Sequence, residues 1–364
     1  MRNGEAAGRI VARLRLRIRR FANCLAVTLL AGACSYTPPQ SAPPQGPGPC
    51  VIDSRGVNSV HEFALKTKYS FPSGITPGPD GNVWFTETGT DKIGRITTNG
   101  AISEFPLSPA SGPIGIVLGP DGNLWVAETY ANKIAVISPA GAVIGEYAIP
   151  TANSDDRFIT SGPDGNIWFT ETRGNKIGRI TPKGAITEFP LPGKSNSGPQ
   201  RIIAGPDGNL WFTYDTSPRD AVVRMTPGGV VTQFPIPESN PLSGNELPDG
   251  ITVGPDGNLW FTELGSVIGV LTPSGTFVAQ YPVPGPNAQN QDAAGITLGP
   301  DGRVYFTGRT SNSIGYIVPP GDHGAFPIPS ARALPSTIVV GPDGNLWFTE
   351  DSANKVACLA PQPH

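Results

Sequence analysis

The sequence has 364 residues, with 38% apolar and 15% charged side chains, 46 glycines and 41 prolines. This composition argues against a helical bundle, and the many Trp, Phe and Tyr residues argue against a disordered chain; short strands joined by tight turns fit it best. Outside the arginine-rich residues 1–20 the chain holds 19 basic and 28 acidic residues, and such an acidic body excludes nucleic acid as an expected partner.

Residues 1–34 predict an export signal. Seven arginines precede the apolar stretch Phe21–Ala33, which is too short to cross a bilayer as a stable helix. The small residues before Cys34 resemble a bacterial lipobox, although Ala31 stands where leucine is usual. We therefore predict that Cys34 is lipidated. The alternative is an ordinary cleaved signal, with Cys34 free or removed.

The next segment, residues 35–55, predicts a tether. Its first part, "SYTPPQSAPPQGPGP", is rich in proline, and a sequence of this kind is stiff and does not fold. A tether would hold a folded domain away from a membrane, which favours lipidation of Cys34. The expected location is the cell envelope or periplasm of a bacterium, with the lipid as the only membrane attachment.

Seven near-copies of one ten-residue motif follow, of which "GPDGNLWFTE" is the fifth. They begin at Gly78, Gly119, Gly162, Gly205, Gly254, Gly299 and Gly341. The steps of 41 to 49 residues are those of propeller blades with four strands each. Residues 56–364 are therefore predicted to form an all-β, seven-bladed β-propeller. In each copy Pro-Asp-Gly predicts a tight turn rather than a calcium site.

The last copy lacks an outer strand, because the chain stops after "NKVACLAPQPH". The stretch "GVNSVHEFALK", residues 56–66, resembles the outer-strand sequences of the other copies. We expect this N-terminal strand to complete the seventh blade, which would remove the open sheet edges. The pairing brings Cys50 near Cys358 and predicts a disulfide worth roughly 4–5 kcal/mol as an upper estimate. Two free thiols are the alternative.

The motif ends in glutamate in five of its seven copies. These residues are Glu87, Glu128, Glu171, Glu263 and Glu350. A ring of five carboxylates on one face could bind a cation or a cationic ligand. In four copies, however, a lysine follows five residues later. An ion pair across the hairpin, worth only ~0–1 kcal/mol if exposed, is therefore the favoured explanation for those four glutamates.

Long stretches such as "GPDGNIWFTETRGNKIGRITPKGAITEFPLP", residues 162–192, resemble the streptogramin B lyase family, also called virginiamycin B lyases. The resemblance covers about residues 56–360. It implies a seven-bladed propeller that opens a cyclic depsipeptide antibiotic by elimination across its ester, with Mg²⁺ as an aid. It also implies a site on one propeller face, where inner strands begin Pro-His-Gly-Ile or a close variant and a histidine removes the proton.

The histidine position of that pattern is occupied differently in this sequence. Its seven occupants are Ser73, Ile114, Arg157, Gln200, Asp249, Ala294 and Ser336. Of the three histidines, His61 and His323 fall on outer-strand sequences and His364 is the last residue. The resemblance therefore implies that the catalytic base of the family is missing here.

An acidic cluster is the strongest candidate for a site of another kind. Asp249 takes the histidine position, Glu246 lies in the longest connecting loop, and Glu263 has no lysine after it. Together these three carboxylates could bind Mg²⁺ or Ca²⁺. Gln200 and Arg201, one blade earlier, complete the predicted ligand-binding residues. A solvated acidic loop is the alternative, and no organic cofactor is expected.

Two functions follow from these observations. The first is recognition of a small molecule or an envelope protein by an exported, lipid-anchored monomer. The second is a divalent-metal-dependent lyase or lactonase that uses carboxylates where the family uses histidine. Convergence of the three carboxylates of the acidic cluster would favour the enzyme.

Overall fold

A computed structural model describes most of the predicted propeller. The described residues are 50, 59–193, 198–215, 220–237, 247–263, 267–283 and 293–361. The export signal, Cys34, nearly all of the tether and Glu246 lie outside them. No helix within the described ranges is long and apolar enough to span a membrane.

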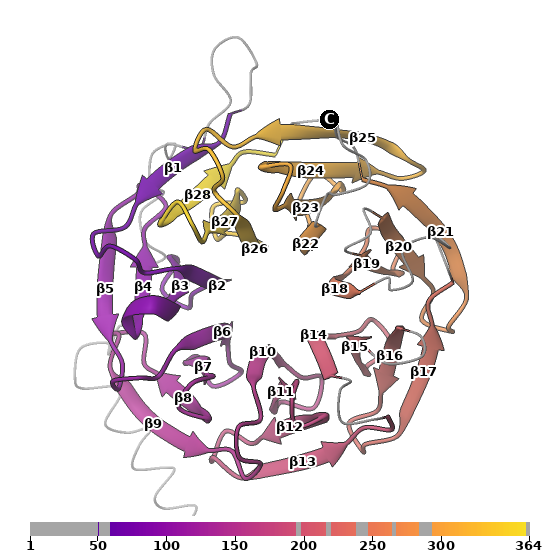
Figure 1. Ribbon diagram of the computed structural model, residues 1–364, viewed down its shortest axis with the longest axis horizontal. Coiled ribbons are helices and arrows are strands. Elements are labelled where there is room, and N and C mark those ends of the chain that lie inside the picture. The colour runs from indigo at the N-terminus through magenta and orange to yellow at the C-terminus, as the bar shows by residue number, and fades with distance from the viewer. Residues whose placement is uncertain are drawn as a thin grey trace, which may run out of the picture. The chain divides into compact units, whose positions relative to one another are not determined.

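The described strands form seven four-stranded antiparallel sheets around a ring (Figure 1), which confirms the predicted fold. From the inside outward, blades one to three contain β2 (Pro72–Pro77), β3 (Val83–Glu87), β4 (Lys92–Ile96) and β5 (Ile102–Pro106); β6 (Pro113–Leu118), β7 (Leu124–Glu128), β8 (Lys133–Ile137) and β9 (Val143–Ala148); and β10 (Asp156–Ser161), β11 (Ile167–Glu171), β12 (Lys176–Ile180) and β13 (Ile186–Pro190). A 3-10 turn, η1 (Thr88–Thr90), follows β3.

The remaining blades repeat this order. Blades four to six contain β14 (Gly198–Ala204), β15 (Leu210–Asp215), β16 (Ala221–Met225) and β17 (Val231–Pro235); β18 (Pro248–Val253), β19 (Leu259–Glu263), β20 (Val267–Leu271) and β21 (Phe277–Pro282); and β22 (Ala293–Leu298), β23 (Val304–Gly308), β24 (Ser313–Val318) and β25 (Asp322–Pro327). Blade seven contains β26 (Pro335–Val340), β27 (Leu346–Glu350), β28 (Lys355–Leu359) and, as its outer strand, β1 (His61–Ala64).

The repeated turn holds its aspartate as an acceptor for the following tryptophan. In blade three, Asp164 accepts hydrogen bonds from the indole Nε1 of Trp168 at 2.9 Å and from the side chain of Asn166 at 2.8 Å. Gly165 closes the turn with a φ of +74°, which glycine adopts without strain. Burial alone would raise the pKa of Asp164, but these hydrogen bonds outweigh it and lower the pKa. The predicted tight turn at Pro-Asp-Gly is thus confirmed.

We expect Asp164→Ala to lower the free energy of unfolding by about 1–3 kcal/mol, because the indole N–H of the fully buried Trp168 would lose its acceptor. Urea denaturation at neutral pH measures this change. Asp164→Asn is the matched control, since its amide oxygen can still accept the bond. Equal stability of the alanine variant and the wild type would contradict the assigned role.

Neighbouring blades pack through apolar side chains. One core cluster joins Trp125 and Ile134 of blade two to Ile159 and Phe169 of blade three. Within a blade, the tryptophan of the second strand stacks on an aromatic residue of the outer strand, as Trp168 does on Phe189 at 5.3 Å between ring centroids. Both faces of each sheet are therefore covered, as a propeller requires.

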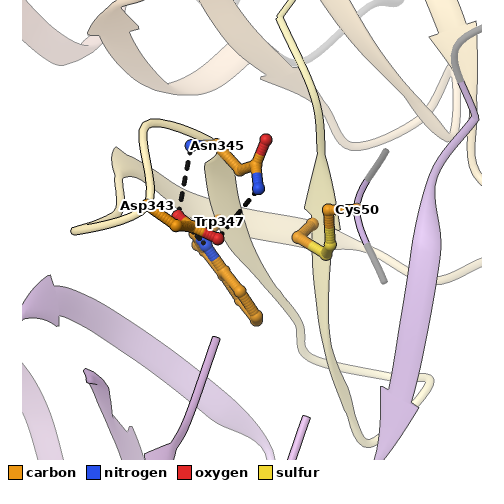
Figure 2. The surroundings of a disulfide bond; sticks show 5 residues. Cys50, Asp343, Asn345 and Trp347 are labelled. Atoms are coloured by element: carbon orange, nitrogen blue, oxygen red, sulfur yellow. Dashed lines mark hydrogen bonds between the residues drawn. A yellow bond between two sulfur atoms is a disulfide. The ribbon is translucent and has the colours of Figure 1, made fainter. Parts of the chain in front are cut away.

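The seventh blade closes the ring as expected. β1 pairs antiparallel with β28, with His61 opposite Cys358 and Phe63 opposite Val356. Cys50 and Cys358 form a disulfide with their Cα atoms 5.9 Å apart. Cys358 lies opposite Trp347 in the β27–β28 ladder, and Figure 2 shows the disulfide together with Trp347 and its hydrogen-bond acceptor Asp343. The predicted closure and the predicted disulfide are both confirmed.

Candidate functional site

A cavity lies where the inner strands of the ring begin. Its volume is about 380 Å³. Six of the seven histidine-position residues line it: Ser73, Ile114, Arg157, Gln200, Asp249 and Ser336. The seventh, Ala294, is buried. The repeat therefore brings together, on one face, the positions at which the sequence placed the candidate site.

Charged groups of both signs face this cavity. Arg157, Arg201 and Arg309 come from blades three, four and six, and Asp215, Asp249 and Asp351 come from blades four, five and seven. Burial raises the pKa of Asp215, and the charge of Asp220 raises it further. Burial also raises the pKa of Asp351, against the opposing charge of Arg309. The cavity therefore presents cationic and acidic groups close together.

Arg201 reaches across the axis of the ring. Its Nη1 donates to the hydroxyl of Thr337 in blade seven at 3.1 Å. Its guanidinium carbon lies 4.5 Å from the ring centroid of Phe158 in blade three. Its Nε lies 3.5 Å from Oδ1 of Asp249 in blade five. One side chain thus contacts three blades besides its own.

These contacts depend on one layer of the inner strands. Gly74, Gly115, Gly250 and Gly295 occupy this layer in four blades, where the next blade approaches closely: a Cβ on Gly74 would lie 2.3 Å from the carbonyl oxygen of Ile114. Phe158, Arg201 and Thr337 take the same position in the other three blades, and Arg201 contacts both of the others. The departures from the repeat therefore meet at one point of the channel.

The next layer of the channel is apolar. Each blade supplies one isoleucine: Ile75, Ile116, Ile159, Ile202, Ile251, Ile296 and Ile338. They line a second cavity of about 210 Å³, which Arg201 also lines. Arg201 consequently lies at the boundary between a charged cavity and an isoleucine-lined one.

The predicted acidic cluster is only partly described. Asp249 faces the cavity beside Arg201, and Glu263 is fully buried, with its Oε1 accepting a bond from Gln280 at 3.4 Å. Glu246 lies outside the described residues. Among the residues that the structure describes, no three His, Cys, Asp or Glu side chains are placed to hold a metal ion. The guanidinium beside Asp249 also disfavours a divalent cation there.

Residues 59–292 and 243–363 match the model of the virginiamycin B lyase family. This chain belongs to that family. Among solved structures, a streptogramin B lyase is 34% identical with a TM-score of 0.75, covering 83% of this chain and 97% of that one. The virginiamycin B lyase of Staphylococcus aureus is 36% identical, with a TM-score of 0.75 and coverage of 84% and 100%.

A third solved structure bears on the chemistry. It is a histidine-to-alanine variant of the Staphylococcus aureus enzyme, described as catalytically inactive and bound to quinupristin, again 36% identical with a TM-score of 0.75 and coverage of 84% and 100%. In the present chain, the two described histidines are His61 and His323. They lie on the outer strands β1 and β25 and are exposed. Neither lines the cavity.

The strand-ending glutamates of this family member do not form an exposed ring. Glu87, Glu128, Glu171, Glu263 and Glu350 are each 0% exposed. The predicted ion pair between each of these glutamates and the lysine that follows it is also wrong. Each lysine pairs instead with a glutamate of the outer strand. The pairs are Lys92–Glu104 at 2.9 Å, Lys133–Glu146 at 2.9 Å, Lys176–Glu188 at 2.6 Å and Lys355–Glu62. The outer strand is the next strand of the sheet, and its glutamate lies diagonally opposite the lysine, as Glu188, the partner of Gly178, does for Lys176.

A buried carboxyl in blade three went unnoticed in the sequence. Asp156 stands where five other blades have proline, directly opposite Glu171 in the β10–β11 ladder. It is 0% exposed, and neither of its carboxyl oxygens has a hydrogen-bond partner. Burial, together with the charges of Glu171, Asp155 and Glu128, raises its pKa to about 8. The replacement of the repeated proline was the signal that could have identified it.

Proposed function

We propose that this protein is an exported, lipid-anchored propeller that recognises a small molecule in the cavity at the start of its inner strands, without the elimination chemistry of its relatives. The observation that carries the proposal is the lining of the cavity. It holds three arginines, three aspartates and neutral polar groups, and none of its described residues is an imidazole. The volume of about 380 Å³ falls in the usual range for ligand pockets, about 300–1,000 Å³.

The absence of an imidazole argues against proton removal at neutral pH. A general base works best with a pKa near the operating pH, which histidine supplies without special surroundings. The relative whose histidine is replaced by alanine is described as inactive while it still binds quinupristin. By analogy, a family member without this histidine is expected to keep a binding surface and lose turnover.

Export is part of the proposal. The disulfide between Cys50 and Cys358 is a kind of bond that persists in oxidising compartments. The arginine-rich start, the apolar stretch and Cys34 supply the predicted signal and lipid attachment site. Metabolic labelling with a fatty acid tests this, because Cys34→Ala should abolish the label.

Incubation with a streptogramin B antibiotic such as quinupristin and Mg²⁺ is expected to give no ring opening above the uncatalysed rate, measured by liquid chromatography and mass spectrometry. The Staphylococcus aureus enzyme is the positive control. A broad small-molecule library, screened by thermal shift, tests binding itself, since a ligand at 100 times its Kd stabilises by about 2.7 kcal/mol. Antibiotic turnover, or a library without a single binder, would refute the proposal.

The second candidate is a divalent-metal-dependent lyase or lactonase. It is supported by family membership and by the pairing of Pro248 with Glu263, which places Glu263 next to the position of Asp249. It requires Glu246 to supply a third carboxylate. Isothermal titration with Mg²⁺ and Ca²⁺ tests it: binding that Asp249→Ala abolishes would support the enzyme, and no binding to the wild type would exclude the site.

A further inference from the structure

We propose that the ligand of the cavity is a small organic anion, a carboxylate on an apolar body, and that Arg201 binds its carboxylate. This inference rests on the proposed function, because it assigns a chemical class to the ligand of the same cavity. It is carried by the free donors of Arg201, the two other arginines that line the cavity and the shape of the channel.

Arg201 has hydrogen-bonding capacity to spare. A guanidinium has five N–H donors, and of these only one, on Nη1, donates to a described residue, Thr337. Nε is buried and has no hydrogen-bond partner; its separation of 3.5 Å from Asp249 is an ion pair without a hydrogen bond. The planar arrangement of these donors matches a carboxylate, which can accept two parallel bonds.

The position of Arg201 is fixed before a ligand arrives. Phe158 supports one face of the guanidinium and Thr337 holds one nitrogen, while the side chain is only 16% exposed. A group that is already ordered loses little conformational entropy when it binds. Arg201 is therefore suited to recognition rather than only to bridging the blades.

Two further cations lie near Arg201. Arg157 and Arg309 face the same cavity. The cavity also contains three aspartates, of which Asp249 lies beside Arg201. Arg157 is also paired with Asp155, through Nε and Oδ1 at 3.0 Å. A ligand carboxylate would add one negative charge to a cavity in which the cationic groups are always charged.

The shape of the channel suggests the rest of the ligand. Ile114, Phe158 and Leu247 line the upper cavity beside the charged groups, and the isoleucine layer lies beyond Arg201. An apolar body would gain by burial against these groups, while its carboxylate meets Arg201.

The test uses matched pairs of probes: benzoate with benzamide, and 4-phenylbutyrate with 4-phenylbutyramide. Binding to the oxidised protein is measured by isothermal titration and thermal shift. We expect at least one carboxylate to bind and its amide to bind at least tenfold more weakly. Arg201→Met, which keeps the apolar stem over Phe158, should weaken the carboxylate about 10- to 100-fold, as loss of a charged hydrogen bond does.

Two further variants sharpen the result. Asp249→Asn should strengthen carboxylate binding by up to about fivefold, because it removes a competing negative charge beside Arg201. If Asp249 instead binds a metal ion, the same variant should lose metal binding. Arg179→Met is the control for folding, because Arg179 also lies over aromatic rings, Trp168 and Phe189, but does not line the cavity. It should leave binding unchanged.

Equal binding of amide and carboxylate, or full carboxylate affinity in Arg201→Met, would overturn the inference. So would a library in which other compounds bind and none of the carboxylates does, a result that leaves recognition of a small molecule intact. A library without any binder overturns the proposed function together with this inference.

Discussion

The free energy of unfolding is expected to fall as the pH rises from about 5 to about 8, and Asp156→Asn is expected to remove a large part of that fall. The reason is the group of buried carboxyls between blades two and three. Asp156, Glu128 and Glu171 are each 0% exposed. Burial raises the pKa of Glu128 and of Glu171 to about 7, with the charges of Glu146 and Glu188 as the next causes.

The sign follows from proton linkage. The ordinary pKa of Asp156 is 3.8 and its pKa in the folded protein is about 8. Between these values the folded protein holds a proton that the unfolded chain has released. Stability therefore decreases with rising pH by about 1.4 kcal/mol per pH unit for each such group, and levels off above the folded pKa. Below the unfolded pKa both states are protonated, and the penalty is absent.

Asp156→Asn cannot ionise, so its stability advantage over the wild type grows with pH. The advantage at pH 8 is expected to exceed that at pH 5 by on the order of 2–4 kcal/mol. Guanidinium denaturation at both pH values measures it. Asp322→Asn, an exposed position on β25, is the matched control and should change stability equally at both. Parallel pH profiles for wild type and Asp156→Asn would show that the buried carboxyl carries no penalty.

The fold could be predicted because its determinants are local and repeated. The turn Gly162–Gly165 and the strand that ends at Glu171 recur seven times at blade-length spacing, and strand and turn sequences repeated at that period indicate a propeller. Closure by β1 was predictable because the last copy lacks a strand and residues 56–66 supply its pattern. The disulfide between Cys50 and Cys358 followed from that register.

The site could be predicted only in outline. The resemblance to the streptogramin B lyase family placed the site at the start of the inner strands, and the residues at that position in each copy gave Gln200, Asp249 and the neighbouring Arg201 as candidates. The sequence did not reveal that Arg201 contacts both Phe158 and Thr337, because these residues come from blades four, three and seven and their contacts depend on the diameter of the ring. The predicted partner of Lys176 was wrong for a similar reason. The repeat pattern pointed to Glu171, but the side chain of Lys176 extends to Glu188.

Removal of the disulfide, by reduction or by the double substitution Cys50→Ser and Cys358→Ser, is expected to lower the free energy of unfolding by about 2–5 kcal/mol. The bond joins residues 308 positions apart. Without the bond, the unfolded chain is no longer closed into a loop nearly as long as the propeller, so its conformational entropy is larger and unfolding is favoured. Denaturation of the oxidised, reduced and substituted proteins measures the effect, and reductant should change only the wild type.

The loss should begin at one place. β1 is the only outer strand that is not continuous in the chain with the rest of its sheet, so it is held by its ladder to β28, by the pair Lys355–Glu62 and by the disulfide. Without the disulfide, amide exchange should accelerate first in β1 and β28, whereas β12 and β13 of blade three, joined by a tight turn, should keep their protection until global unfolding. Uniform acceleration in all seven blades would mean that the ring opens as one unit and that closure by Cys50 does not act locally.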